Sequence, residues 1–281
     1  MIHKLKRQWR TRSREPELNM MDDDQNAGRR NQGQKENKDR DSNEPSENRG
    51  IPENPGPPDW ALARPGLAER LRRTGRLRLA LTGGAASGKS RVAGLMETLG
   101  ARQVDLDDLS REATAPGQAG FKAVLELLGP AFLGPDGTLD RAGIGRAVFA
   151  DPEARRGLEA ALHPLIWDLL DRKMADLDDE PAVVVSVPLL FETGLNSLFR
   201  PIILVFASPA TQTARLLARR SHMNRQEAKR LLEAQWPAAP KIKGADFIIN
   251  NDGEWAETEA QVRTLWPRLL AGALKSAILH S

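Results

Sequence analysis

One eight-residue run constrains the fold of this chain more than any other feature of the sequence. Residues 83–90 read Gly-Gly-Ala-Ala-Ser-Gly-Lys-Ser and match the pattern G-x-x-x-x-G-K-[ST]. A short apolar segment at 77–82 precedes the run, and apolar residues at helical spacing follow it up to Gly100. Strand, glycine-rich loop and helix together predict a phosphate-binding loop. The curled backbone points N–H groups inward, and the helix N-terminus adds partial positive charge.

Two side chains of the run have defined chemistry. Lys89 can reach the β- and γ-phosphates of a nucleotide, and the hydroxyl of Ser90 can bind Mg²⁺. The alternative is a glycine turn that joins a strand to a helix and binds nothing. The flanking strand and helix favour the phosphate loop, because they are the context in which this motif binds phosphate.

Composition divides the chain into a charged extension and a folded body. Residues 1–59 hold nine apolar side chains against 12 basic and 12 acidic ones. Such a segment buries too little apolar surface to offset its ordering entropy. Residues 60–76 are rich in arginine, and the body beyond them is close to neutral. We therefore predict a disordered extension at 1–76, a catalytic domain at 77–272 and a short C-terminal tail at 273–281. The alternative for residues 60–76 is that Trp60 and Leu71 pack onto the body beside the first strand.

The start of the chain is basic, which leaves several interpretations open. It is either an electrostatic arm for nucleic acid or anionic lipid, or a solvated tail, or a product of an upstream start codon. A near-neutral body without tyrosine argues against nucleic-acid binding. No apolar core of a secretory signal follows the basic start, and the longest apolar stretch, at 182–191, is too short to span a bilayer. The chain has no cysteine, so we expect a cytoplasmic protein without disulfides and without membrane contact.

The body alternates between strand and helix patterns. Beyond the first strand at 77–82, apolar or β-branched runs predict strands at about 101–105, 183–187, 201–206 and 247–249. Helical patterns separate them, including a long helical region at about 109–177. The expected fold class is α/β, a three-layer parallel sheet of the P-loop NTPase type with a helical substrate-binding insert and a lid at about 215–240.

In a parallel sheet the ligand binds at the carboxyl ends of the strands. Asp105, Asp107 and the segment 188–192 come at such ends, and Asp107 is suited to orient an acceptor hydroxyl near the γ-phosphate. The alternative is that the aspartates only cap the next helix. Arg219 is a candidate for stabilising phosphoryl charge, whereas arginines at a helix C-terminus also suit the helix dipole without any substrate.

An ordered set of segments resembles one family, the bacterial dephospho-coenzyme A kinases. The set begins with Leu-Ala-Leu-Thr-Gly-Gly at 79–84 and Val-Asp-Leu-Asp at 104–107. It continues through 135–141, 148–152, His-Pro-Leu-Ile at 163–166, Val-Pro-Leu-Leu-Phe-Glu at 187–192, Gln235 and 245–251. The resemblance spans roughly residues 77–270.

The resemblance implies transfer of the ATP γ-phosphate to the ribose 3′-hydroxyl of dephospho-CoA, with Mg²⁺. Carried over by position, Asp107 is the catalytic base, Lys89 and Arg219 act on the phosphates, and His163 serves structure or substrate contact. The residues that would hold the nucleotide are Gly83, Gly84, Ala85, Ala86, Ser87, Gly88, Lys89, Ser90 and Arg91, with Ser90 toward the metal.

Three features depart from the family pattern. Arg91 stands where a threonine is common, the link at 220–223 is one residue longer than usual, and the extension has no counterpart. A GTP-dependent switch is the rival interpretation of the phosphate loop. It requires Asn-Lys-x-Asp after a strand, and the nearest match, at 37–40, lacks the final Asp and lies in the extension.

Overall fold

A computed structural model describes residues 65–219 and 223–279, and side chains up to residue 273. The predictions made for residues 1–64 and for the link at 220–222 lie outside this range. Within it, five parallel strands form one sheet in the order β2-β3-β1-β4-β5. The strands are β1 (Leu77–Thr82), β2 (Arg102–Asp105), β3 (Ala182–Ser186), β4 (Ile202–Phe206) and β5 (Phe247–Asn250).

Helices connect the strands and cover both faces of the sheet. The α-helices are α3 (Pro65–Leu71), α4 (Lys89–Thr98), α5 (Leu106–Ala113), α6 (Ala119–Leu128), α7 (Arg141–Ala150), α8 (Pro152–Asp176), α9 (Pro209–Arg219), α10 (Arg225–Glu233), α11 (Ala238–Gly244) and α12 (Trp255–Leu279). Two short 3₁₀ turns, η1 (Pro130–Phe132) and η2 (Leu195–Leu198), complete the described elements. Every residue of β1 and β3 is buried, as expected of central strands covered on both faces.

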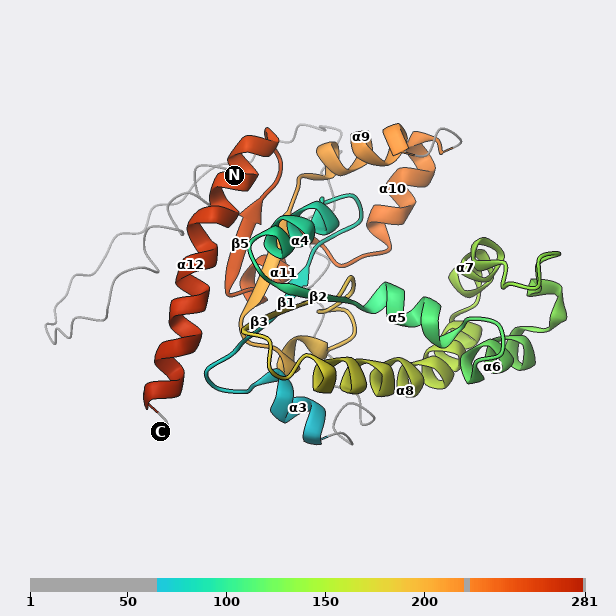
Figure 1. Cartoon of the computed structure of the whole chain (residues 1–281). Helices are drawn as coiled ribbons and strands as arrows, with labels where there is room; N and C mark the ends of the chain where they lie inside the picture. Colours follow the sequence, from blue (N-terminus) through green and yellow to red (C-terminus); the bar gives the residue numbers. More distant parts are fainter. Residues whose placement is uncertain (1–64, 220–222, 280–281) are drawn as a thin grey trace, which may run out of the picture. The chain divides into compact units, whose positions relative to one another are not determined.

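The two faces of the sheet carry separate apolar cores. Alternate residues of β1 divide between them, since Ala80 packs with α3 and α8 while Leu79 and Leu81 pack with α4 and α12. Figure 1 shows α12 and α8 on opposite sides of the strands. This arrangement confirms the predicted three-layer α/β fold.

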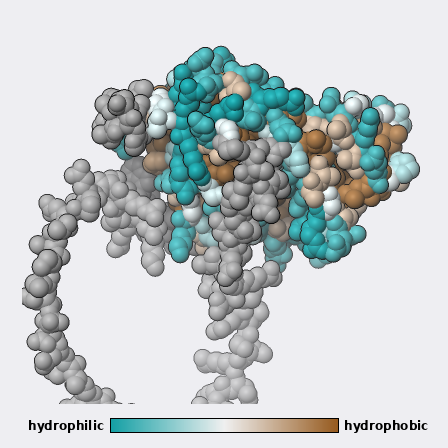
Figure 2. Space-filling model, turned by 90° about the horizontal axis from the view of Figure 1, so that it is seen from below, coloured by the Kyte–Doolittle hydropathy of each residue, from teal (hydrophilic) through white to brown (hydrophobic). Residues whose placement is uncertain are grey.

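The helical region between β2 and β3 extends beyond the sheet. It comprises α5 to α8, and Gly and Pro residues lie at the turns between these helices. A third core, which includes Val124, Ile144 and Leu162, packs α6 and α7 against α8 away from the sheet (Figure 1). Apolar side chains also remain exposed on these helices, and Figure 2 shows brown surface gathered at that end of the molecule; Phe149 is 67% exposed.

Part of the predicted extension belongs to the folded body. Helix α3 lies within the range 1–76, yet Leu67 and Leu71 are 2% and 0% exposed in the core beside α8. The arginines that looked like linker pair with acidic residues of α8 and the turn after it: Arg70 with Asp171, Arg73 with Asp178, and Arg76 with Asp179. Disorder is therefore the wrong prediction for residues 65–76. Local sequence did not reveal these ion pairs, because the pairing partners lie about 100 residues further along the chain.

Two further boundaries can be compared with the prediction. Helix α12 continues through Leu279, so most of the residues assigned to a C-terminal tail are helical. Helix α10 begins inside the predicted lid at about 215–240, and Asn224 and Glu227 form a capping box at its start. Among the described residues, no helix has both the length and the apolar content that crossing a bilayer would require.

Candidate active site

The phosphate loop joins β1 to α4, and α4 begins inside the motif at Lys89. Gly88 precedes it with a φ of 92°, in the left-handed region that glycine adopts without strain. Gly83 is required for a different reason. A Cβ there would lie 2.5 Å from Oγ of Ser87 and 2.7 Å from the carbonyl oxygen of Val205. Both glycines thus follow from the geometry of the loop.

The backbone N–H groups in the first turn of α4 can bind an anion. The N–H groups of Arg91 and Val92 donate to the carbonyl of Gly88, which closes the turn. The N–H groups of Lys89 and Ser90 precede any intrahelical acceptor, as at the start of every α-helix. Together with the helix dipole they favour a bound phosphate at this position.

Lys89 connects the loop to the carboxyl ends of two strands. Its Nζ donates a hydrogen bond to Oγ of Ser186 and lies 3.5 Å from Oδ2 of Asp105. Ser186 is the last residue of β3 and is fully buried, and it pairs with Asp105, the last residue of β2. The lysine charge is therefore held at the edge of the sheet where the sequence predicted a ligand crevice.

The structure gives the neighbouring aspartates different surroundings. Asp105 is the N-cap of α5, and its Oδ1 accepts the N–H of Asp107 at 2.8 Å. Asp107 lies in the first turn of α5, and its side chain caps nothing. Although the residue is exposed overall, loss of hydration around its carboxyl raises the pKa of Asp107 above the ordinary value. The carboxylate of Asp105 raises it further, whereas Lys89 lowers it. The capping interpretation thus fits Asp105 and not Asp107.

Arg219 lines a hollow of about 270 Å³ that lies beside the phosphate loop. The guanidinium of Arg91 stacks over the ring of Trp255 at 3.9 Å in the same hollow. The remaining lining residues are Gly88, Arg215, Asn251, Gly253 and Glu254. The structure therefore brings the predicted Arg219 and Arg91 to one hollow beside the phosphate loop.

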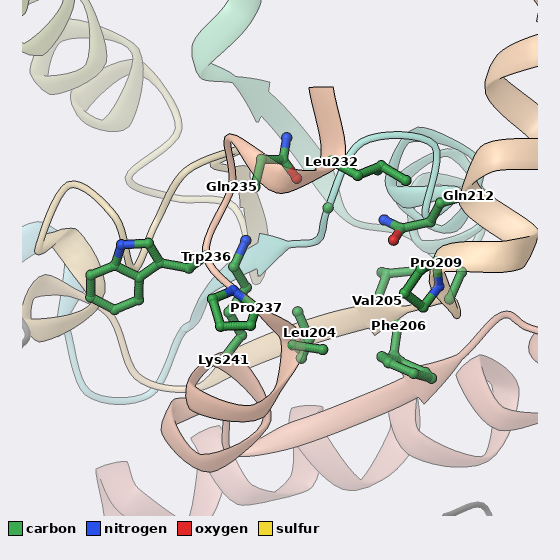
Figure 3. A pocket seen from close by; sticks show the side chains of 13 residues that line it. Leu204, Val205, Phe206, Pro209, Gln212, Leu232, Gln235, Trp236, Pro237 and Lys241 are labelled. Atoms are coloured by element: carbon green, nitrogen blue, oxygen red, sulfur yellow. The ribbon is translucent and has the colours of Figure 1, made fainter. Parts of the chain in front are cut away.

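A second, smaller hollow of about 110 Å³ opens between Gly84, the end of β4 and residues 232–238 (Figure 3). Lys241 lines it and is 4% exposed, and its Nζ lies 2.5 Å from Oε1 of Glu192. The same carboxylate oxygen accepts the N–H of Trp236 at 3.1 Å. Glu192, expected in the crevice segment, instead ties the chain beyond β3 to α11.

Sequence reasoning missed several polar contacts of the loop. Ser186 was detectable only as one polar residue inside a β-branched strand. Gln212 and Arg215, which donate to loop carbonyls, stand three residues apart on α9, a spacing that places both on one helix face. Their partners lie more than 120 residues earlier in the chain, so no local pattern could reveal the contacts.

The binding of Mg²⁺ by Ser90 and the role of His163 stay predictions. Across residues 65–219 and 223–279, no three His, Cys, Asp or Glu side chains gather in a way that could hold an ion. Mg²⁺ in kinase sites takes few protein ligands and is held largely by phosphates, so the exposed Ser90 at the start of α4 fits that mode. His163 lies inside α8, and burial lowers its pKa, which favours the neutral imidazole.

The sheet order, the phosphate loop after β1 and the carboxylates at the end of β2 define a P-loop NTPase fold of the kinase class. A sequence model of the dephospho-CoA kinase family matches residues 77–257. The chain belongs to the dephospho-CoA kinase family, and membership makes it an ATP-dependent kinase.

Individual relatives support the assignment. The chain is 44% identical to the dephospho-CoA kinase of Geobacter metallireducens, over 67% of this chain and 94% of that enzyme. It is also 44% identical to the enzyme of Parasynechococcus marenigrum, over 63% of this chain and 88% of that one. Among solved structures, TT1252 from Thermus thermophilus aligns with a TM-score of 0.61 and 32% identity, covering 69% of this chain and 98% of that one. Dephospho-CoA kinase from Campylobacter jejuni aligns with a TM-score of 0.53 and 25% identity, over 69% and 97%.

Proposed function

We propose that this protein transfers the γ-phosphate of ATP to the ribose 3′-hydroxyl of dephospho-CoA, which yields coenzyme A and ADP. The observation that carries the proposal is the family match over 77–257, which contains the complete phosphate loop and the acidic end of β2. The reaction is the last step of coenzyme A synthesis. The cytoplasmic location and the absence of nucleic-acid partners stay predictions from the sequence.

The phosphate loop binds the nucleotide in this proposal. Loop N–H groups and the start of α4 receive the phosphate oxygens, and Lys89 neutralises charge that develops on the transferred group. The hydroxyl of Ser90 would bind Mg²⁺, which neutralises phosphate charge when it is bound with ATP. The contact between Lys89 and Asp105 supports this role, because it holds the ammonium group near the carboxylates at the end of β2.

Asp107 acts as the general base. Its carboxylate accepts the proton of the ribose 3′-hydroxyl as that oxygen bonds to the γ-phosphorus, and the bond from the γ-phosphorus to the ADP oxygen breaks. The raised pKa of Asp107 supports the assignment, since a carboxylate that binds protons more tightly than usual is a better proton acceptor. Asp105, occupied by the cap of α5 and by Lys89, is a positioning residue.

The other regions bind the two substrates. The helical region at about 109–177 receives dephospho-CoA, and its exposed apolar side chains, Phe149 among them, support a surface for a largely aliphatic ligand arm. The lid at about 215–240 brings Arg219 to the ATP phosphates, which its place in the hollow beside Gly88 supports.

Release of ADP by the purified full chain tests the proposal. With ATP and Mg²⁺, dephospho-CoA should support ADP release, whereas pantetheine, shikimate and AMP should not. The product should have the mass and the chromatographic retention of authentic coenzyme A. ADP release that another acceptor supports and dephospho-CoA does not would overturn the assignment.

A further inference from the structure

Three consecutive carbonyl groups of the phosphate loop accept hydrogen bonds from side chains outside the loop. Nε2 of Gln212 donates to Ala85 at 2.8 Å, and Nδ2 of Asn251 donates to Ser87 at 2.7 Å. Nη1 of Arg215 lies between them and donates to the carbonyls of Ala86 and Ser87 at 3.4 and 3.3 Å. No carbonyl in this stretch of the loop is therefore left to turn toward the phosphates.

The donors are themselves fixed by the fold. Gln212 and Arg215 share one face of α9 because they are three residues apart. Asn251 follows β5 and is 4% exposed, and its Oδ1 accepts the hydroxyl of Thr258 at 2.9 Å. That bond determines which end of the amide faces the loop. Nη2 of Arg215 also donates to the carbonyl of Asn251 at 2.8 Å, so the two elements are joined to each other.

Ala85 is held from both sides. Its N–H donates to Oε1 of Gln235 at 3.0 Å, while its carbonyl accepts from Gln212. Figure 3 shows these two glutamines on different elements around the smaller hollow, Gln212 on α9 and Gln235 beyond α10. Gly84 leaves room for them, because a Cβ there would lie 2.5 Å from Nε2 of Gln212.

Because the peptide unit is planar, hydrogen bonds to the outward carbonyls of the loop also orient the N–H groups that follow them. The carbonyl of one residue and the N–H of the next point in opposite directions across a trans peptide. Holding the carbonyls of Ala85 and Ser87 outward therefore turns the N–H groups of Ala86 and Gly88 inward. Neither of these N–H groups has a hydrogen-bond partner among the described residues, and the N–H of Ser87 is used within the loop by Gly84.

We propose that Gln212, Arg215 and Asn251 form an outer bracket, a set of positioning residues that preorganise the N–H groups of Ala86 and Gly88 for the nucleotide phosphates. The proposal rests on the proposed function in that ATP is the occupant. The bracket residues act through the loop backbone. Their removal should weaken binding of the polyphosphate and leave recognition of the rest of the nucleotide unchanged.

The test compares ADP with AMP, because AMP lacks the β-phosphate. In Gln212→Met, which keeps the side-chain length and removes the donor, the Kd of ADP should rise about 2- to 12-fold. The Kd of AMP and the melting temperature should stay at the wild-type values. Arg215→Met should weaken ADP binding at least as much. Arg215→Lys, which keeps a charged donor, should recover part of the lost affinity. KM for ATP should rise with the Kd of ADP while KM for dephospho-CoA does not.

Two control variants match these changes. Thr213→Val lies on α9, and among the described residues the hydroxyl of Thr213 bonds to the carbonyl of Pro209 and not to the loop. Arg263→Met removes an arginine of α12 that pairs with Glu259. Both should bind ADP as wild type does. Unchanged ADP affinity in Gln212→Met and Arg215→Met would overturn the bracket, and so would equal weakening of ADP and AMP. Since these titrations contain no acceptor, a wild-type chain that binds ADP without phosphorylating dephospho-CoA would contradict only the proposed function.

Discussion

At the scale of residues, the most informative contrast is between two aspartates that stand two positions apart. Asp105 receives an N–H of α5 and the ammonium of Lys89, whereas Asp107 receives neither and has a raised pKa. Spacing in the sequence could not separate capping from catalysis. The hydrogen bonds favour Asp107 as the proposed base, because the side chain of Asp105 is already engaged as a cap and an ion-pair partner and is poorly placed to accept a substrate proton.

Asp107→Asn should lower kcat by roughly 10²–10⁴-fold and leave ATP affinity nearly unchanged. Stability should move the other way. A raised folded pKa means that protonation favours the folded state, so this stabilisation is lost as pH rises, and the charged carboxylate destabilises the fold at neutral pH. The variant should therefore melt at or above the wild-type temperature near pH 7.5, and the advantage should vanish in acid.

Asp105→Asn is the matched control for this measurement. Asparagine can also cap α5, so folding should be retained while the contact with Lys89 weakens. A large loss of kcat in Asp105→Asn, with none in Asp107→Asn, would show that the other carboxylate is the base.

Lys89→Met should reduce kcat/KM by at least about 10²-fold without unfolding the protein, because the long apolar side chain replaces the stem and removes only the charge aimed at the phosphates. Thermal melting and steady-state turnover measure the two parts of this prediction. Arg102→Met, which removes an exposed cation paired with Glu180 at the start of β2, is the control. Turnover within threefold of wild type would contradict the nucleotide-binding role.

At the scale of elements, local patterns predicted what local contacts determine. The phosphate loop and the strands predicted at about 183–187 and 201–206 depend on neighbouring residues, and the structure contains them as the loop before α4 and as β3 and β4. The contacts of Ser186, Gln212 and Gln235 depend instead on strand order and on elements distant in the chain. Those residues could be found only once the fold was in view.

The buried pair of Lys241 and Glu192 is a contact of this distant kind. Lys241→Met should destabilise the fold by about 3 kcal/mol, since it leaves the carboxylate of Glu192 buried with only the N–H of Trp236. Lys241→Met combined with Glu192→Gln should recover much of that loss, because no unpaired charge remains. Urea unfolding of the two single variants and the double variant completes the cycle. Additive losses would show that the pair is not coupled.

At the scale of the whole molecule, the sequence predicted the sheet, its layers and the helical region, but it placed the domain boundary too late. The phosphate loop and the β-branched runs predict the strands, whereas the sequence of α3 has only two leucines near several arginines and gives no such pattern. Its stability depends on the core beside α8 and on acidic partners about 100 residues away. The family match begins at residue 77, so α3 is an addition of this chain to the region that the family model covers.

Truncation separates this addition from the residues before it. A chain that begins at Pro65 should keep the melting temperature and the kcat/KM of the full chain, because nothing in residues 1–64 matches the family and their composition predicts disorder. A chain that begins at Leu77 should melt several degrees lower and show apolar exposure by dye binding. Leu67 and Leu71 are each worth about 1.5–3 kcal/mol when fully buried. Leu71→Ala in the full chain is the point control, with an expected loss of about 2–5 kcal/mol. Equal stability of the two truncated chains would show that α3 does not support the kinase body, and a loss of turnover on removal of residues 1–64 alone would assign a role to the extension.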